Sequence, residues 1–288
     1  MVAVCRAIAS ARGTHDIDDP YSAAFVSASG VPYWTAFLES GAALLAQSTD
    51  FAIKARAMLG HVVARTRFID RFIEDSIGDS ARQLVILGAG FDTRAERLEL
   101  LDGKAVYEVD IEPVTRFKSS ALESAQFDGA HKPILIGADL AGDWLPRLVE
   151  AGWDATVPTV WVAEGLLGYL HGPEQEALLL TIAEHSPEGS TALFEYAATI
   201  SSHTEVQTDN PPMEQFSSDA DAALPDLTTL IHVEQRTAPD DFLGRCGWRN
   251  EVAAGAEVYT HWFDETDIQV RAAALSPQFD TRFIVSRK

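Results

Sequence analysis

The chain contains little cysteine and no regular histidine spacing, which excludes several kinds of site. Its 288 residues include two cysteines, Cys5 and Cys246, near opposite ends of the sequence. Such a pair forms neither a metal-binding nor a redox spacing, so we expect two free thiols. The eight histidines are scattered without the spacing of a zinc site. We therefore expect no bound metal.

Basic residues are also scarce. The chain has 22 lysines and arginines against 43 aspartates and glutamates, a net charge of −21. Such a charge works against binding to nucleic acid or an anionic membrane through a general field. No run of residues approaches the ~18 apolar residues needed to cross a bilayer, and the N-terminus has no convincing signal peptide. We expect a cytoplasmic protein that binds neither nucleic acid nor membrane; its oligomeric state stays open.

One stretch organises the rest of the chain. The apolar run 83–87 predicts a buried strand, and Gly88-Ala89-Gly90 follows it directly. The glycines allow a tight turn and a close approach of the backbone to a ligand. Thr93 followed by Glu96 has the spacing of a capping box, which predicts that the next helix starts here. A strand, a glycine turn and a helix start form a common cradle for cofactors.

The glycine turn departs from the fingerprint of dinucleotide-binding proteins. Thr93 stands where the third glycine of that fingerprint belongs. Asp92 would repel a pyrophosphate there but would suit a cationic ligand, such as the ammonium and sulfonium of S-adenosylmethionine. An NAD(P)-dependent oxidoreductase is the less favoured alternative.

Apolar runs then alternate with helical stretches. This alternation predicts an α/β fold with a doubly wound, mostly parallel sheet, closed by two final strands near the C-terminus, for example as an antiparallel pair. The expected strands after the first lie at 105–109, 133–137, 159–163, 191–196, near 247–248 and at 281–286, and the helices near 113–125, 144–151 and 173–186.

Three acidic residues follow the predicted strands. Asp110, Asp139 and Glu164 each stand at or just past a strand's carboxyl end. Because the carboxyl ends of parallel strands share one edge, where ligands bind, we expect these side chains to lie close together. Asp110 follows Gly88 by 22 residues, where an acid would meet the ribose hydroxyls of an adenosine ligand.

The residues before the first strand are predicted to be helical. We expect residues 1–80 to pack as a helical region on a core of residues 81–288. A helix predicted over about 50–77 carries Arg65 within its apolar stripe, where an arginine needs an anion such as a cofactor carboxylate. Arg67 falls instead with Asp70, Arg71 and Glu74, a pattern typical of a solvated face.

A polar segment interrupts the second half of the chain. From about 198 to 240 the composition shifts to serine, threonine, aspartate and proline. A structureless loop of that length is unusual in a compact domain, so we expect a partly helical lid insertion that contributes to substrate specificity.

Taken together, these stretches resemble the leucine carboxyl methyltransferase family, class I S-adenosylmethionine-dependent enzymes with a Rossmann-like fold and a seven-stranded sheet. The matching pieces, in the family's order, are Asp19-Pro20-Tyr21, the run 64–70 (ARTRFID), the run 87–94 (LGAGFDTR), Glu108-Val109-Asp110, Ala138-Asp139-Leu140 and the run 163–170 (AEGLLGYL).

The resemblance implies S-adenosylmethionine as cofactor and a role for each matching position. Arg65, with Arg67 as a second candidate, would hold the carboxylate of the methionine part, and Glu164 would lie near its ammonium. An N-terminal basic residue, Arg6 or Arg12, could assist. The remaining expected cofactor contacts are Gly88, Ala89, Gly90 and Asp92 in the turn, Asp110 and Ile111 at the ribose, and Asp139 and Leu140 at the adenine.

The sequence predicts an O-methyltransferase acting on a small-molecule acceptor. A carboxylate with a pKa of about 4 is ionised at neutral pH and needs no general base. A hydroxyl would need one, and His203 is the first candidate, although a surface histidine is the simpler interpretation. Tyr169 is a candidate substrate contact or a core tyrosine. A methyltransferase acting on a protein's C-terminal carboxylate and a non-catalytic ligand-binding relative stay open as alternatives.

Overall fold

The computed structural model describes most of the chain. The described residues are 1–13, 17–78, 80–125, 131–197, 231–232, 234–260, 268–275 and 281–288. Most of the expected lid at 198–240, including His203, lies outside these residues. The statements below concern the described part.

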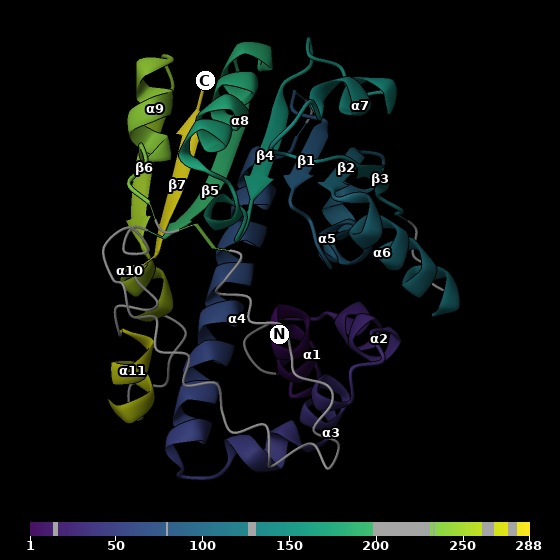
Figure 1. Ribbon diagram of the computed structural model, residues 1–288, viewed down its shortest axis with the longest axis vertical. Coiled ribbons are helices and arrows are strands. Elements are labelled where there is room, and N and C mark those ends of the chain that lie inside the picture. The colour runs from purple at the N-terminus through teal and green to yellow at the C-terminus, as the bar shows by residue number, and fades with distance from the viewer. Residues whose placement is uncertain are drawn as a thin grey trace.

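The core is a seven-stranded sheet with strand order β3-β2-β1-β4-β5-β7-β6 (Figure 1). Strands β1 to β5 run parallel, and β7 pairs antiparallel with both β5 and β6. The predicted doubly wound sheet with two final antiparallel strands is confirmed, but the sixth strand begins at Arg249, after the predicted residues 247–248. The strands are β1 (Gln83–Leu87), β2 (Ala105–Asp110), β3 (Ile134–Gly137), β4 (Thr159–Ala163), β5 (Thr191–Ala197), β6 (Arg249–Ala254) and β7 (Thr281–Arg287).

Four helices precede β1, and shorter ones connect the strands. The first four are α1 (Val2–Ala11), α2 (Pro20–Ala28), α3 (Pro32–Leu45) and α4 (Asp50–Ser76). The others are α5 (Arg94–Arg97), η1 (Glu99–Leu101), α6 (Glu112–Ser124), α7 (Leu145–Glu150), η2 (Leu167–Tyr169), α8 (Gly172–His185), α9 (Pro239–Arg245), α10 (Gly255–Thr260) and α11 (Ile268–Ala274). None of the helices in the described part is long and apolar enough to cross a membrane.

Alternating side chains of the strands enter two hydrophobic clusters, one on each face of the sheet. On one face, Leu87 and Trp161 belong to a cluster that includes residues of α7, α8 and α9. On the other, Ile86 and Val162 pack in a cluster with α4 residues such as Ile73. Both faces are thus covered, as a parallel sheet requires.

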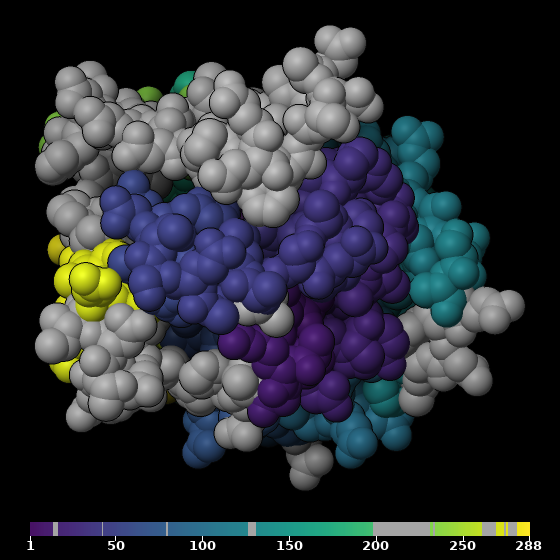
Figure 2. All heavy atoms as spheres, turned by 90° about the horizontal axis from the view of Figure 1, so that it is seen from below, coloured from purple at the N-terminus to yellow at the C-terminus, as the bar shows by residue number. Residues whose placement is uncertain are grey.

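Helices α1 to α3 lie beyond the edge at which the parallel strands end, which we call the carboxyl edge (Figure 1). In Figure 2 the N-terminal helices, in purple, and α4, in blue, lie side by side across this end of the molecule. Local capping sets where two of them begin: Asp19 accepts from the backbone N–H of Ser22 at 3.0 Å, and Thr49 from that of Ala52 at 3.2 Å. The helical region therefore stands over the edge where the acidic strand ends gather.

Candidate functional site

The glycine turn adopts the backbone conformation that its sequence predicts. Gly88 and Gly90 have φ angles of 64° and 53°, in the left-handed region that favours glycine. A Cβ atom at Gly88 would lie 2.9 Å from the Leu166 side chain, whereas one at Gly90 would meet nothing within 4 Å. Packing against Leu166 thus requires glycine at position 88, whereas Gly90 leaves open space where a ligand could approach the backbone.

The helix after the turn starts where predicted, but the expected capping box does not form. Thr93 is the N-cap residue of α5 and makes no side-chain cap. Its hydroxyl donates instead to Asp19 of the α2 cap at 2.8 Å. Asp92 takes over the capping role, accepting the backbone N–H of Arg94 at 2.7 Å. The N-terminal helices are thereby tied to the glycine turn.

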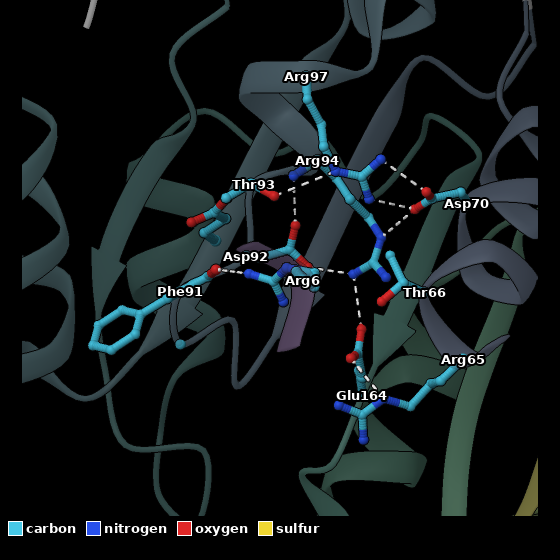
Figure 3. Close-up of polar contacts among 12 residues, drawn as sticks. Arg6, Arg65, Thr66, Asp70, Phe91, Asp92, Thr93, Arg94, Arg97 and Glu164 are labelled. Carbon is cyan, nitrogen blue, oxygen red and sulfur yellow. Dashed lines mark hydrogen bonds and ion pairs between the residues drawn. The ribbon is translucent and has the colours of Figure 1, made fainter. Parts of the chain in front are cut away.

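Arg94 is the centre of a buried ion-pair network (Figure 3). Its side chain is 2% exposed and contacts three carboxylates from separate parts of the chain. It donates to Asp70 of α4 and to Glu164 after β4, both at 2.8 Å, and also pairs with Asp92. Arg97 adds two further hydrogen bonds to Asp70, at 2.7 and 2.8 Å. The network joins α4, the glycine turn and the end of β4.

Two expectations about this region are wrong. Asp70 does not lie on a solvated face with Arg67; its side chain is 2% exposed, because Arg94 and Arg97 neutralise it. The carboxylate of Asp92 does not stand free to meet a cationic ligand, since its two oxygens contact the Arg94 backbone N–H and guanidinium. Only the outer side of α4, where Arg71 pairs with Asp75 at high exposure, behaves as predicted.

Arg65 lies inside the protein, as its place in the apolar stripe predicts. Its Nε atom is 2.9 Å from Glu164, and its Nη1 donates to the two oxygens of Glu195 on β5 at 3.1 and 2.9 Å. Nη2 has no partner among the described residues. Arg67, one residue beyond the intervening Thr66, is only partly buried.

Glu164 is held as an anion. Burial alone would raise its pKa, but the positive charges of Arg65, Arg94 and Arg6 outweigh burial and lower the pKa to about 2. The side chain is 12% exposed, so it is not wholly enclosed by these partners. It can therefore present negative charge to a bound cation at neutral pH.

The other strand-end acids lie at the same edge. Asp110 accepts the backbone N–H groups of Gly90 and Ile111, both at 2.7 Å. It therefore joins the glycine turn to the end of β2, and each oxygen keeps a lone pair for a hydroxyl. Asp139 accepts the N–H of Ala141 at 3.0 Å. Ile111 is 50% exposed, which leaves an apolar surface beside Asp110.

The remaining candidate residues differ in their exposure to solvent. Tyr169 on η2 is 43% exposed, so its interpretation as a core tyrosine is wrong. Arg6 of α1 is buried; it donates to the carbonyl of Phe91 in the glycine turn and pairs with Asp19 at 2.8 Å. Arg12 is exposed at the end of α1. Of the two N-terminal arginines, Arg6 is the one that reaches the site.

A second cluster of buried charges connects α6 with the glycine turn and with β2. Lys118 of α6 donates to the backbone carbonyl of Asp92 and to Glu108 of β2, both at 2.5 Å, and lies 3.4 Å from Glu96. Burial raises the pKa of Glu108, which Lys118 opposes and Glu96 reinforces. The spacing of residues in the sequence predicts neither this cluster nor the role of Glu195. Both depend on the fold, which brings α6 against the glycine turn and β5 beside Arg65.

The site suits S-adenosylmethionine in the chemistry of its groups. The open space at Gly90, a guanidinium nitrogen of Arg65 without a partner in the described part, the anionic Glu164 and the doubly anchored Asp110 share one edge. No three metal-binding side chains are grouped among the described residues. Fold and site together define a class I S-adenosylmethionine-dependent methyltransferase.

Comparison with known proteins supports this assignment. Residues 1–183 match the sequence model of the leucine carboxyl methyltransferase family, and the chain belongs to this family. A protein of Mycolicibacterium gilvum, provisionally named an S-adenosyl-L-methionine-dependent methyltransferase, is 35% identical over 91% of this chain and 84% of its own. A relative from Mycolicibacterium smegmatis with the same provisional description is also 35% identical, over 91% of this chain and 86% of its own. The protein is therefore an S-adenosylmethionine-dependent methyltransferase.

One solved structure shows the same fold at low identity. A DUF574 family protein from Streptomyces avermitilis superposes with a TM-score of 0.56 at 14% identity, covering 92% of this chain and 95% of its own.

Proposed function

We propose that this methyltransferase transfers the methyl group to a carboxylate of a small-molecule acceptor, an O-methylation that forms an ester. The family description names a carboxyl group as acceptor, which supports this choice. S-adenosylmethionine supplies an electrophilic methyl group on a sulfonium.

The observation that carries the proposal is the state of the ionisable side chains at the carboxyl edge. Glu164 has a pKa of about 2 and so is a poor base. Burial, reinforced by the charge of Arg65, lowers the pKa of His61 to about 3, and its Nε2 is hydrogen-bonded to Tyr259 at 3.0 Å. The oxygens of Glu195 both contact Arg65. Glu164 and His61 are too weakly basic to deprotonate a hydroxyl near neutral pH, and Glu195 is engaged by Arg65, so an acceptor already ionised fits best.

In this proposal the chain's own residues bind and orient. Arg65 holds the carboxylate of the methionine part through Nη2, Glu164 faces its ammonium, and Gly88, Ala89 and Gly90 allow it to pass close to the backbone. Asp110 accepts from the ribose. The adenine lies near Ile111, Asp139 and Leu140, and the exposed Tyr169 contacts the acceptor. Orientation of this kind can supply ~7–11 kcal/mol of the barrier reduction.

The test uses radiolabelled methyl donor and a panel of small carboxylic acids and phenols. A methyl ester releases volatile labelled methanol on mild alkaline treatment, whereas a methyl ether does not. We expect alkali-labile label in the low-molecular-mass fraction. Label that survives alkali would contradict the carboxylate proposal, and alkali-labile label on a protein fraction would instead identify a protein carboxyl group as the acceptor.

A further inference from the structure

Arg65 carries more negative charge than it can neutralise. Its guanidinium contacts Glu164 through Nε and Glu195 through Nη1, each with a closest distance of 2.9 Å. The three side chains are between 6% and 12% exposed. One positive and two negative charges therefore share a nearly dry space, before any ligand adds a further carboxylate.

The two carboxylates differ in their other partners. Glu164 has a second arginine, since Arg94 donates to it at 2.8 Å. Glu195 has only Arg65 as a cationic partner within the described residues. Gly165, held at a φ angle of 63°, brings its backbone close: a Cβ there would lie 3.8 Å from Glu195. Glu195 is thus more easily protonated than Glu164.

We propose that Glu195 is an exchangeable counter-ion of Arg65: it orients the guanidinium in the free protein and takes up a proton when a cofactor carboxylate binds to Arg65. The inference rests on the function proposed above, because it assumes that Arg65 holds that carboxylate. The proton comes from the buffer and forms an O–H bond on Glu195, so Arg65 exchanges one carboxylate for another without breaking the Arg65–Glu164 pair, and the ligand's ammonium faces Glu164. Glu195 is then a positioning residue, acting on the cofactor through Arg65.

The charged and titratable groups around Glu195 favour this exchange. Burial raises its pKa in the free protein, Arg65 of α4 opposes this, and the negative charge of Glu164 reinforces it. Tyr259 of α10 adds no charge, since burial and the nearby Glu195 raise the pKa of its hydroxyl and it stays protonated. His61 of α4, with a pKa of about 3, is neutral. A hydrogen bond from the Gly165 backbone also lowers the pKa of Glu195. A further carboxylate on Arg65 weakens the larger of these two stabilising interactions, the one with the guanidinium.

The experiment measures the dissociation constant of S-adenosylhomocysteine by calorimetry from about pH 6 to about pH 9, in buffers of different ionisation enthalpy. The wild type is compared with Glu195→Gln, which keeps the shape and removes the charge. Glu251→Gln is the matched control, because Glu251 is 74% exposed on β6 and pairs with Arg287.

Linkage sets the expected result. Between the pKa of Glu195 in the free and in the loaded protein, the wild-type dissociation constant rises with pH, by up to about tenfold per unit, with proton uptake on binding. The dissociation constant of Glu195→Gln lacks this part of the pH dependence. At the alkaline end of the range this variant binds S-adenosylhomocysteine more tightly than the wild type does. Glu251→Gln follows the wild type.

Each other outcome is decisive. Parallel pH profiles, with Glu195→Gln weaker throughout, would show a merely structural role and overturn the exchange. Should the variant not fold, the wild type alone decides, because binding without proton uptake contradicts the inference. If the wild type binds no S-adenosylhomocysteine at any pH, the site assignment under the proposed function fails instead.

Discussion

Replacing Gly90 by alanine tests whether the open space at the glycine turn is where the cofactor lies. Gly90 has a φ angle of 53°, and a Cβ there would meet nothing within 4 Å. The substitution therefore costs only the strain of a left-handed alanine, about 1–2 kcal/mol. The new methyl group would stand in the space assigned to the cofactor, so we expect S-adenosylhomocysteine to bind at least about tenfold more weakly, a loss of about 1.4 kcal/mol.

Gly103 provides the matched control. It has a φ angle of 68°, its Cβ direction is equally open, and it lies just before β2, at the opposite edge of the sheet. Gly103→Ala should lose the same stability in urea denaturation and bind S-adenosylhomocysteine like the wild type in calorimetry. Wild-type affinity in Gly90→Ala, or an equal loss of affinity in both variants, would refute the placement of the cofactor over this turn.

Three further predictions concern the charges and thiols. Arg94→Met leaves buried carboxylates without their partner and should cost about 3–5 kcal/mol in urea denaturation, against at most about 0.5 kcal/mol for Arg71→Met at the exposed pair; equal losses would contradict the network. The pKa of Glu164 is lowered to about 2, so its stabilisation is complete above its unfolded value near 4.5 and is lost as pH falls towards 2. Acid titration of Glu164→Gln should therefore show about 3 kcal/mol less pH dependence than the wild type, and an unchanged acid transition would contradict this. Burial raises the pKa of the Cys5 thiol to about 11, so Cys5→Ser and Cys246→Ser should keep methyl transfer in the radiolabel assay, and loss of turnover with normal folding would contradict this.

The positions and direction of the parallel strands were predictable from the sequence because they depend on local patterns. The apolar run 83–87 and the run 159–163 form fully buried strands at the predicted residues. The shared edge of Asp110 and Glu164 follows from parallel topology, and the burial of Arg65 from its place in an apolar stripe. These inferences need only periodicity and the direction of the crossovers.

The partners of these residues could not be predicted in the same way. Helical spacing predicts a solvated Asp70, because it shares a face with Arg67, Arg71 and Glu74, yet α5 places two arginines against it. Glu195 lies 130 positions from Arg65 in the sequence, and no spacing connects them. Long-range ion pairs depend on how α4 packs on the sheet, and that packing is decided by the whole core rather than by any single segment.

The most direct test of the account compares two ligands on two variants by calorimetry. S-adenosylhomocysteine carries the amino-acid part of the cofactor, and methylthioadenosine lacks it while keeping ribose and adenine. We predict that Arg65→Ala loses affinity for S-adenosylhomocysteine and keeps its affinity for methylthioadenosine, whereas Asp110→Ala loses affinity for both. If Arg65→Ala bound both ligands like the wild type, or if Asp110→Ala did, the assignment of the site would be contradicted.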